Sequence, residues 1–341
     1  MTLAERIART NYVRGRFRNR QHREWFHFYI LTPDVDLIAN FNLTFDPEFD
    51  SATHYRIVAL ARVGETWTGD VTKASHAVAP SGGTGLLSDN GGFELHRDGI
   101  DVMLATEDVQ CRLRLTPLTE PVHTNSVSFS GDQALRWIAV PHLVANGTIE
   151  VAGRSHDIVD ANAYHDHNWG QFRWGDDFSW EWIGFTSDDR DDVRYSGVFT
   201  RMSDRYAHTT LSQSLFAWRN GNLMRVLSGG ELEVHRTGLK TIATKLRVPR
   251  VARLALPGEH DSLPERIDIR STTHHPSAAI SVTPNDNVQV LVPNDADDES
   301  ATLISESRCN VRGALFDNVA RRIANLTGVG LLEQINSVRL R

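Results

Sequence analysis

The chain has 341 residues and a net charge of −7, with 40% hydrophobic and 23% charged residues. These values are typical of a soluble globular protein of one large or two ordinary domains, and they argue against nucleic acid as a partner. No apolar run approaches the roughly 18 residues that a membrane-spanning helix needs. The two cysteines, Cys111 and Cys309, lie far apart, which indicates neither a disulfide scaffold nor a cysteine-based zinc site and favours a reducing cytoplasm.

The N-terminal segment 1–22 is rich in arginine and lacks the apolar stretch of a secretory signal. We interpret it as a solvated basic arm. Peripheral contact with an anionic membrane, where a hydrophobic substrate would reside, is the alternative. The expected location is therefore the cytoplasm, with or without association with a membrane surface.

Short stretches of alternating apolar and polar residues recur through the rest of the chain, which is the pattern of β-strands. Turn signals separate these stretches, for example Asn146-Gly147 and Asn220-Gly221. Many short strands with few helical patterns favour a β-barrel or a sandwich. The expected strands include residues 24–30, 37–45, 55–63, 100–105, 109–115, 136–140, 147–151, 178–185, 194–200, 208–218, 267–270, 280–282, 288–292 and 303–312.

One stretch near the C-terminus has the spacing of an amphipathic helix instead. We predict a helix over 314–326 that packs across the end of a barrel, with partner binding as the alternative. Its apolar stripe would consist of Leu315, Phe316, Val319, Ile323 and Leu326.

Seven consecutive residues carry the strongest functional signal: Tyr164-His165-Asp166-His167-Asn168-Trp169-Gly170. In a strand, alternate side chains point to opposite faces, so one face would present Tyr-x-Asp-x-Asn and the other His-x-His-x-Trp. The pattern does not decide which face lines a cavity. A structural role for the same polar groups, hydrogen-bonded inside a core, is the competing interpretation.

Three more tryptophans follow the motif closely: Trp174, Trp180 and Trp182, with Glu181 between the last two. Electron-rich rings at this density suit a hydrophobic or cationic ligand. Core packing is an equally good explanation for Trp180 and Trp182, because aromatic residues dominate protein cores.

The spacing of His165 and His167 is also that of half a metal site. A metal normally needs three protein ligands, and no second cluster of histidine or acidic residues has convincing spacing. We therefore expect neither a metal nor any other cofactor.

With these residues in view, the chain resembles the carotenoid 1,2-hydratase (hydroxyneurosporene synthase) and AttH-like family, to which tocopherol cyclases and lipocalin-type Diels–Alderases are related. The motif at 164–170 looks like the hallmark of that family. The residues that lead into it also match, with Trp137-x-x-x-Pro141 and then Gly147-Thr148-Ile149. The segment Glu24-Trp25-Phe26-His27-Phe28 is similar to the family's aromatic entry strand.

The resemblance implies an all-β fold of two tandem lipocalin-like β-barrels, which we place at 23–172 and 173–341. It also implies a ligand channel at their junction and a cofactor-independent enzyme acting on a hydrophobic isoprenoid, polyene or polyketide. Hydratases of the family are thought to use a His-x-Trp pair, matched here by His167 and Trp169. They also use an acid behind a tyrosine on a later strand; Tyr195 is the counterpart of that tyrosine, but Gly197 stands in place of the acid.

Hydration or cyclisation of an alkene begins with proton delivery to carbon, which needs an acid that stays protonated near neutral pH. Burial of a carboxyl group provides such an acid. Asp166 is the first candidate and Glu181 the second, and His167 would donate a proton or orient the acid. The carbocation would be stabilised by the rings of Tyr164, Trp169, Trp180 and Trp182.

The remaining candidates are assigned to substrate binding or to support of the motif. His165 joins the catalytic group, and Trp174, Tyr195, Glu24 and Trp25 are expected to contact a hydrophobic small-molecule substrate. Two other functions stay open. One is a pericyclic cyclase or isomerase, for which positioning of a folded polyene is enough. The other is a double lipocalin that binds a lipid or pigment without changing it.

Overall fold

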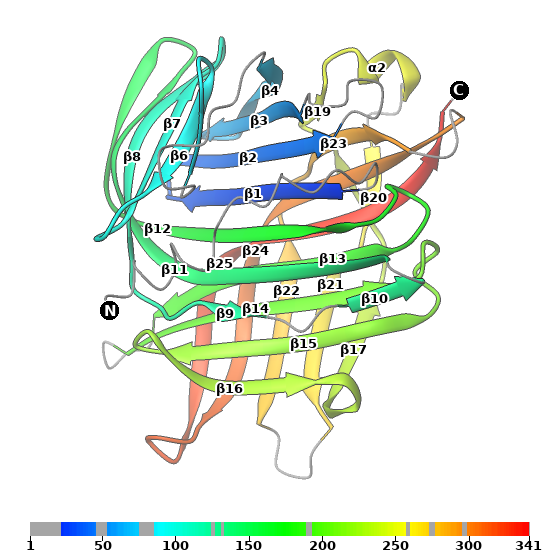
Figure 1. Ribbon diagram of the computed structural model, residues 1–341. Coiled ribbons are helices and arrows are strands. Elements are labelled where there is room, and N and C mark those ends of the chain that lie inside the picture. Colours follow the sequence, from blue (N-terminus) through cyan, green and yellow to red (C-terminus); the bar gives the residue numbers. More distant parts are fainter. Residues whose placement is uncertain are drawn as a thin grey trace. The chain divides into compact units, whose positions relative to one another are not determined.

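The computed structural model shows a protein built almost entirely of β-strands (Figure 1). The predicted all-β class is therefore confirmed. The structure describes residues 22–45, 53–74, 85–123, 127–130, 133–188, 193–256, 260–272, 277–294 and 299–340. The predicted basic arm lies outside the described residues, except for its last residue, His22, which begins the first strand.

The chain divides into two compact units, of which unit 1 ends at Phe172 and unit 2 begins at Arg173. The described part of unit 1 forms a 12-stranded sheet in the order β4-β3-β2-β1-β12-β11-β8-β7-β6-β5, with β9 and β10 both paired to β11. Its strands are β1 (His22–Leu31), β2 (Val35–Phe45), β3 (Thr53–Val63), β4 (Thr66–Ala74), β5 (Gly85–Ser88), β6 (Gly91–Leu95), β7 (Ile100–Ala105), β8 (Val109–Pro117), β9 (Val122–His123), β10 (Val127–Ser130), β11 (Gln133–Val151) and β12 (Arg154–Gln171).

The core of unit 1 follows from the alternation of its strands. On β8, Val109, Cys111, Leu113 and Leu115 are buried while the residues between them are mostly exposed, as expected for a strand with one face on a core. Strand β1 differs, because nearly all of its residues are buried. A strand covered on both faces has no need of polar alternation, which explains the aromatic run at 25–29.

The described part of unit 2 forms an 11-stranded sheet in the order β16-β15-β14-β13-β25-β24-β22-β21-β17, extended by β23 on β24 and by β19 on β23, and a separate pair β18-β20. Its elements are β13 (Ser179–Asp188), β14 (Arg194–Ser203), β15 (Thr210–Arg219), β16 (Asn222–Ser228), η1 (Gly229–Glu231), β17 (Leu232–Thr237), β18 (Lys240–Ala243), β19 (Leu246–Val248), α2 (Ala252–Ala255), β20 (His260–Leu263), β21 (Arg266–Ser271), β22 (Ala278–Pro284), β23 (Val288–Pro293), β24 (Ser300–Asp317) and β25 (Arg322–Arg339).

Unit 2 has its own core, formed by one face of this sheet. Residues such as Ile183, Phe185, Phe199, Val311 and Leu332 are almost fully buried and pack together there. A thiol belongs to each core, Cys111 in unit 1 and Cys309 in unit 2, and both are free. Burial raises the pKa of Cys111 to about 12, so this thiol is unreactive at neutral pH.

The helix predicted over 314–326 is wrong. Strand β24 continues to Asp317, a short turn follows, and β25 returns from Arg322, so that Leu315 pairs with Ala324 and Gly313 with Leu326. Only Leu315 and Leu326 of the expected apolar stripe are buried, whereas Val319 is 72% and Ile323 61% exposed. The helical spacing arose because two alternating strands were read across the turn that separates them.

Neither helical element among the described residues has the length and hydrophobicity that a membrane-spanning helix needs.

Candidate functional site

Strands β1 and β12 hold the hallmark motif and the aromatic entry strand against each other. Their register places Phe28 opposite His165, Phe26 opposite His167 and Glu24 opposite Trp169. Directly opposed residues of an antiparallel pair share one face. Because Phe26 and Phe28 belong to the core of unit 1, the His-x-His-x-Trp face of the motif points into that core.

His167 is bound to Glu24 inside unit 1. Its Nε2 atom lies 2.8 Å from Oε1 of Glu24, and both side chains are fully buried. The imidazole stacks on Phe26, with ring centroids 4.1 Å apart, and its centroid lies 4.6 Å from that of Trp169. Glu24 therefore fixes the orientation of His167 between the rings of Phe26 and Trp169. From the sequence, Glu24 was expected to contact the substrate and His167 to take part in catalysis.

His165 is a neutral imidazole. Its Nδ1 atom lies 3.0 Å from the backbone oxygen of His27, and its ring stacks on Phe28 with centroids 4.2 Å apart. Burial lowers the pKa of His165 to about 3 and that of His27 also to about 3. At neutral pH neither ring carries the extra proton that a general acid must deliver.

On the opposite face of β12 the motif forms a hydrogen-bonded ladder. The Tyr164 hydroxyl donates to Oδ2 of Asp166 at 2.8 Å, and the Asn168 amide donates to Oδ1 at 2.6 Å. Both oxygens of Asp166 thus accept hydrogen bonds from side chains of the motif itself. Tyr164 stacks on Tyr29 of the entry strand at 5.0 Å, while Trp25 meets Phe172 edge to face at 5.9 Å.

The remaining predicted residues belong to unit 2. Glu181 is almost fully buried and paired: Nε and a terminal nitrogen of Arg236 lie 3.1 and 3.2 Å from its two oxygens, and the Gln334 amide donates to it at 2.7 Å. Both oxygens of Glu181 are thus held by one guanidinium group. Tyr195 points to the core of unit 2 and donates to Asp317 at 2.8 Å.

Trp180 and Trp182 lie on the other face of β13 from Glu181. The ring of Trp180 stacks on Phe178 with centroids 5.3 Å apart and lies 5.5 Å from the ring of Trp174. Trp182 is 6% exposed. Three of the four tryptophans of the 169–182 cluster are thus in unit 2, and Trp169 alone is in unit 1.

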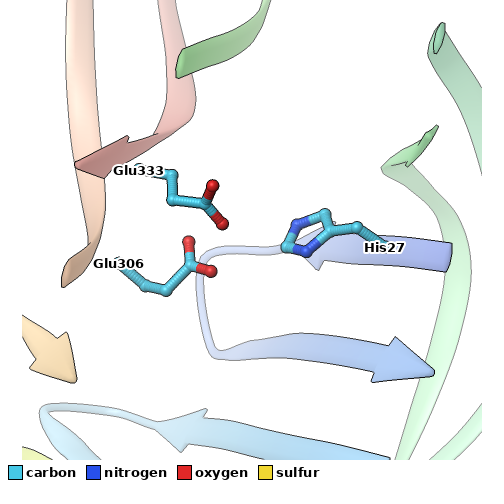
Figure 2. Close-up of side chains that lie close together, drawn as sticks. All are labelled: His27, Glu306 and Glu333. Atoms are coloured by element: carbon cyan, nitrogen blue, oxygen red, sulfur yellow. The ribbon is translucent and has the colours of Figure 1, made fainter. Parts of the chain in front are cut away.

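Sequence reasoning missed two buried acids of unit 2. Glu306 on β24 and Glu333 on β25 are directly opposed in the sheet, 3% and 8% exposed. Figure 2 shows their carboxyl groups pointing toward each other, with His27 of unit 1 as the third side chain drawn. Glu333 stands next to Trp182 in the register of β13 with β25, and it accepts a hydrogen bond from the Trp180 indole N–H.

The two carboxyl groups are close enough to influence each other's ionisation. Burial raises the pKa of Glu333, and the hydrogen bonds with Glu306 and Trp180 offset only part of that effect. A hydrogen bond between two carboxyl groups requires a proton on one of them, because two carboxylates have no donor. The pair therefore holds one proton above the pH at which an ordinary glutamate loses it.

No local signal in the sequence marks this pair. Each glutamate stands in an alternating strand, where an acidic residue is normally read as solvent-facing, and 26 residues separate the two. The predicted helix between them hid the hairpin that brings them together. A reading of 300–339 as one long hairpin would have placed them opposite each other.

No protein-family model matches the chain, and no curated protein matches it. Several solved structures do have a similar fold. An AttH-like protein from Nitrosomonas europaea has 15% identity and a TM-score of 0.61, and the match covers 92% of this chain and 92% of that one. Kievitone hydratase from Nectria haematococca has 14% identity and a TM-score of 0.62, covering 95% and 93%. CghA, solved with Sch210972, has 10% identity and a TM-score of 0.61, covering 93% and 89%.

These matches extend over nearly the whole length of both chains, so both units have counterparts in proteins of this architecture. At such low identity they show the fold alone. They agree with the lipocalin-like architecture that the resemblance of the motif implied, and they do not single out carotenoid hydratases.

Proposed function

We propose that the protein is a cofactor-independent enzyme that protonates a carbon–carbon double bond of a hydrophobic substrate and so starts its hydration or cyclisation. The observation that carries the proposal is the buried Glu306–Glu333 pair. An alkene is a weak base, so its protonation needs an acid that is still protonated at neutral pH. Burial raises the pKa of Glu333 and so favours such an acid there.

The second carboxyl group helps to keep the first protonated, because a like charge beside it disfavours ionisation. With one proton shared between Glu306 and Glu333, the pair carries one negative charge, and transfer of that proton to the substrate leaves two carboxylates, of which Glu333 keeps the hydrogen bond from the Trp180 indole. The proton moves from the Glu333 oxygen to the less substituted alkene carbon, and the carbocation forms at the more substituted one. The carboxylate left behind is then the base that takes a proton from the attacking water or from the cation.

Aromatic rings lie on the same face of the sheet as the acid pair. Trp182 is the cross-strand neighbour of Glu333 and Trp180 is bonded to it. The faces of such rings stabilise a nearby cation by about 0.5–2 kcal/mol each. Capture of the carbocation by water gives an alcohol, and capture by a second double bond or a hydroxyl group gives a ring.

For the motif residues of unit 1 we propose the roles that the family resemblance implies. His167, held by Glu24, and Trp169 would form the substrate-facing His-x-Trp pair, and Asp166 would act as a hydrogen-bond acceptor through its Tyr164–Asn168 ladder. An isoprenoid or polyene remains the proposed substrate class. The fold shared with kievitone hydratase, a hydratase by name, supports the hydration branch.

One observation bears on the more specific resemblance to carotenoid hydratases. The acid of that family would fall at Gly197, where an added Cβ atom would lie 2.3 Å from the Phe185 ring. No aspartate fits there without displacement of Phe185, so the donor role needs another residue. The glycine at position 197 favours the alternative function, a pericyclic cyclase, because such an enzyme needs no acid.

Solvent isotope labelling separates these possibilities. The full chain is incubated in D2O with squalene, geraniol and any lipophile that copurifies with it, and products are analysed by mass. We expect the wild type to place deuterium on carbon, and Glu333→Gln and Glu306→Gln to lose at least a hundredfold in rate. Glu233→Gln, at an exposed position of β17, is the matched control.

A product that is an unlabelled isomer of its substrate would instead establish the pericyclic reaction. Recovery of an unchanged bound ligand from the wild type would support a binding protein. Full activity of Glu333→Gln would refute the assignment of the donor.

A further inference from the structure

A row of polar side chains crosses the inner face of unit 2, at the end of its apolar core. The strand register makes neighbours of Arg201 and Glu181, of Glu181 and Gln334, and of Gln334 and Ser305. Two residues further along β13 the same face presents Ile183 of the core. The polar row is therefore a boundary of the core and not part of it.

A cavity of about 170 Å³ opens over this row. That is several times the ~30 Å³ that a water molecule occupies in the liquid. Arg201, Glu181 and Gln334 line it, and so does Arg236 of β17, which projects from the same side of its strand as the core residue Leu232. Apolar lining comes from Leu239 and Ile335.

The charges of this cavity are not balanced. Glu181 is its one carboxylate among the lining residues described, and both of its oxygens are bound to Arg236, one also to Gln334. Arg201 donates through Nε to Thr210 at 3.1 Å, and its terminal nitrogens have no hydrogen-bond partner within the described residues. Burial, followed by the nearby Arg236 charge, lowers the pKa of Arg201. Two guanidinium groups thus share one anion.

We infer that this cavity of unit 2 binds the carboxylate of a small organic acid with a short apolar chain. A carboxylate accepts two parallel hydrogen bonds from the free edge of a guanidinium group, which is the geometry that Arg201 offers. Its charge would also relieve the repulsion between Arg201 and Arg236. The apolar chain would cover Leu239, which is otherwise 74% exposed, and Ile335.

This site is separate from the proposed reaction and does not rest on it. Glu333 and Gln334 are consecutive on β25, so their side chains point to opposite faces of the sheet. Neither Glu306 nor Glu333 lines the cavity, although Trp180, which is bonded to Glu333, does. The ligand is therefore an additional one, and its carboxylate would be held by Arg201 and not by the acid pair.

Calorimetric titration of the full chain with sodium hexanoate tests the inference. We expect the wild type to bind hexanoate and Arg201→Gln to bind it at least tenfold more weakly. Arg201→Lys, which keeps the charge but loses the planar fork, is expected to fall between them. Arg312→Gln, at an exposed position of β24, should bind as the wild type does.

Two further titrants define the chemical class. 1-Hexanol should bind far more weakly than hexanoate, because it lacks the charge, and inorganic phosphate should bind more weakly because it lacks the chain. Equal binding of hexanoate by Arg201→Gln and wild type, equal binding of hexanol or phosphate, or no measurable heat from the wild type would each overturn the inference. Circular dichroism of each variant confirms that it is folded.

Discussion

The Glu306–Glu333 pair is a costly feature for a protein to keep. An isolated buried carboxylate loses its hydration, and two of them side by side would repel each other. The shared proton and the Trp180 indole reduce this cost, but an apolar pair on two neighbouring strands would avoid it entirely. We infer that the pair is retained for its proton.

This pair makes stability depend on pH in a defined direction. The pKa of Glu333 is raised in the folded state, so above its unfolded value of about 4.3 the native chain holds more protons than the unfolded one. The free energy of unfolding then falls as pH rises, by up to about 1.4 kcal/mol per unit, until the folded pKa is passed. Glu333→Gln should remove this slope.

Urea unfolding at several pH values between 5 and 8 measures the effect, with the exposed Glu233→Gln as the control. An unchanged slope in Glu333→Gln would show that Glu333 titrates as an ordinary glutamate.

The Glu24–His167 contact makes a separate prediction for unit 1. Both side chains are fully buried and 2.8 Å apart, so Glu24→Ala leaves an imidazole without its partner in a closed core. Losses of about 3–5 kcal/mol are typical of such broken pairs. Glu24→Gln keeps an acceptor for His167 and should cost clearly less. Chemical denaturation of both variants compares the two costs, and equal costs would contradict a specific bond to His167.

At the scale of single residues, the sequence predicted candidate groups but not how they combine. The 164–170 motif located His167 and Asp166, yet the bond of His167 to Glu24 joins positions that are 143 residues apart. The acid pair was missed altogether. Such contacts depend on the register of strands that are remote in sequence, and no local pattern specifies that register.

At the scale of elements, the hairpin of β24 and β25 is the clearest departure from expectation. Asp317 organises its turn by accepting the backbone N–H groups of Val319 and Ala320, both at 2.9 Å. It also binds Tyr195 and Arg219 at 2.8 and 2.7 Å. Burial alone would raise the pKa of Asp317, but these bonds hold it below its ordinary value.

Substitution of Arg321 distinguishes this hairpin from a helix. Arg321 has a φ of +51°, a left-handed conformation that costs an arginine about 1 kcal/mol and a glycine almost nothing. Arg321→Gly should therefore leave stability unchanged or raise it by up to about 1 kcal/mol, whereas in a helix it would cost roughly 1 kcal/mol. Thermal unfolding gives the sign, and a clear loss of stability would contradict the turn geometry.

Most strands could be predicted because alternation is a local property. The pattern of β8, with buried Val109, Cys111, Leu113 and Leu115, is readable from the sequence alone. The prediction of a helix over 314–326 was wrong for a related reason. Leu315 and Leu326 are buried in the sheet and fall by chance at helical spacing, and only pairing across the Asp317 turn reveals their true period.

At the scale of the whole molecule, each unit has a core of its own. Phe93 in unit 1 is fully buried and packs against Phe26, Phe28 and Phe41, with ring centroids 4.6–5.6 Å away. Truncation of such a residue costs about 3–5 kcal/mol. Phe93→Ala should increase amide hydrogen exchange mainly in the strands of unit 1.

The matched variant is Phe199→Ala, which removes a fully buried ring of the unit 2 core, and it should act mainly on unit 2. Mass-spectrometric exchange on the full chain maps both effects. An identical increase in both units from either variant would show a single cooperative core instead.

The protonation state of the Glu306–Glu333 pair can be measured without knowledge of the substrate. Infrared spectroscopy distinguishes the C=O stretch of a carboxylic acid from the bands of a carboxylate. At pH 7 the wild type should show a carboxylic acid band that shifts in D2O and is lost in both Glu333→Gln and Glu306→Gln, while Glu233→Gln retains it. A wild-type spectrum in which that band is absent, or in which neither substitution changes it, would mean that the pair holds no proton at neutral pH and cannot start the proposed reaction.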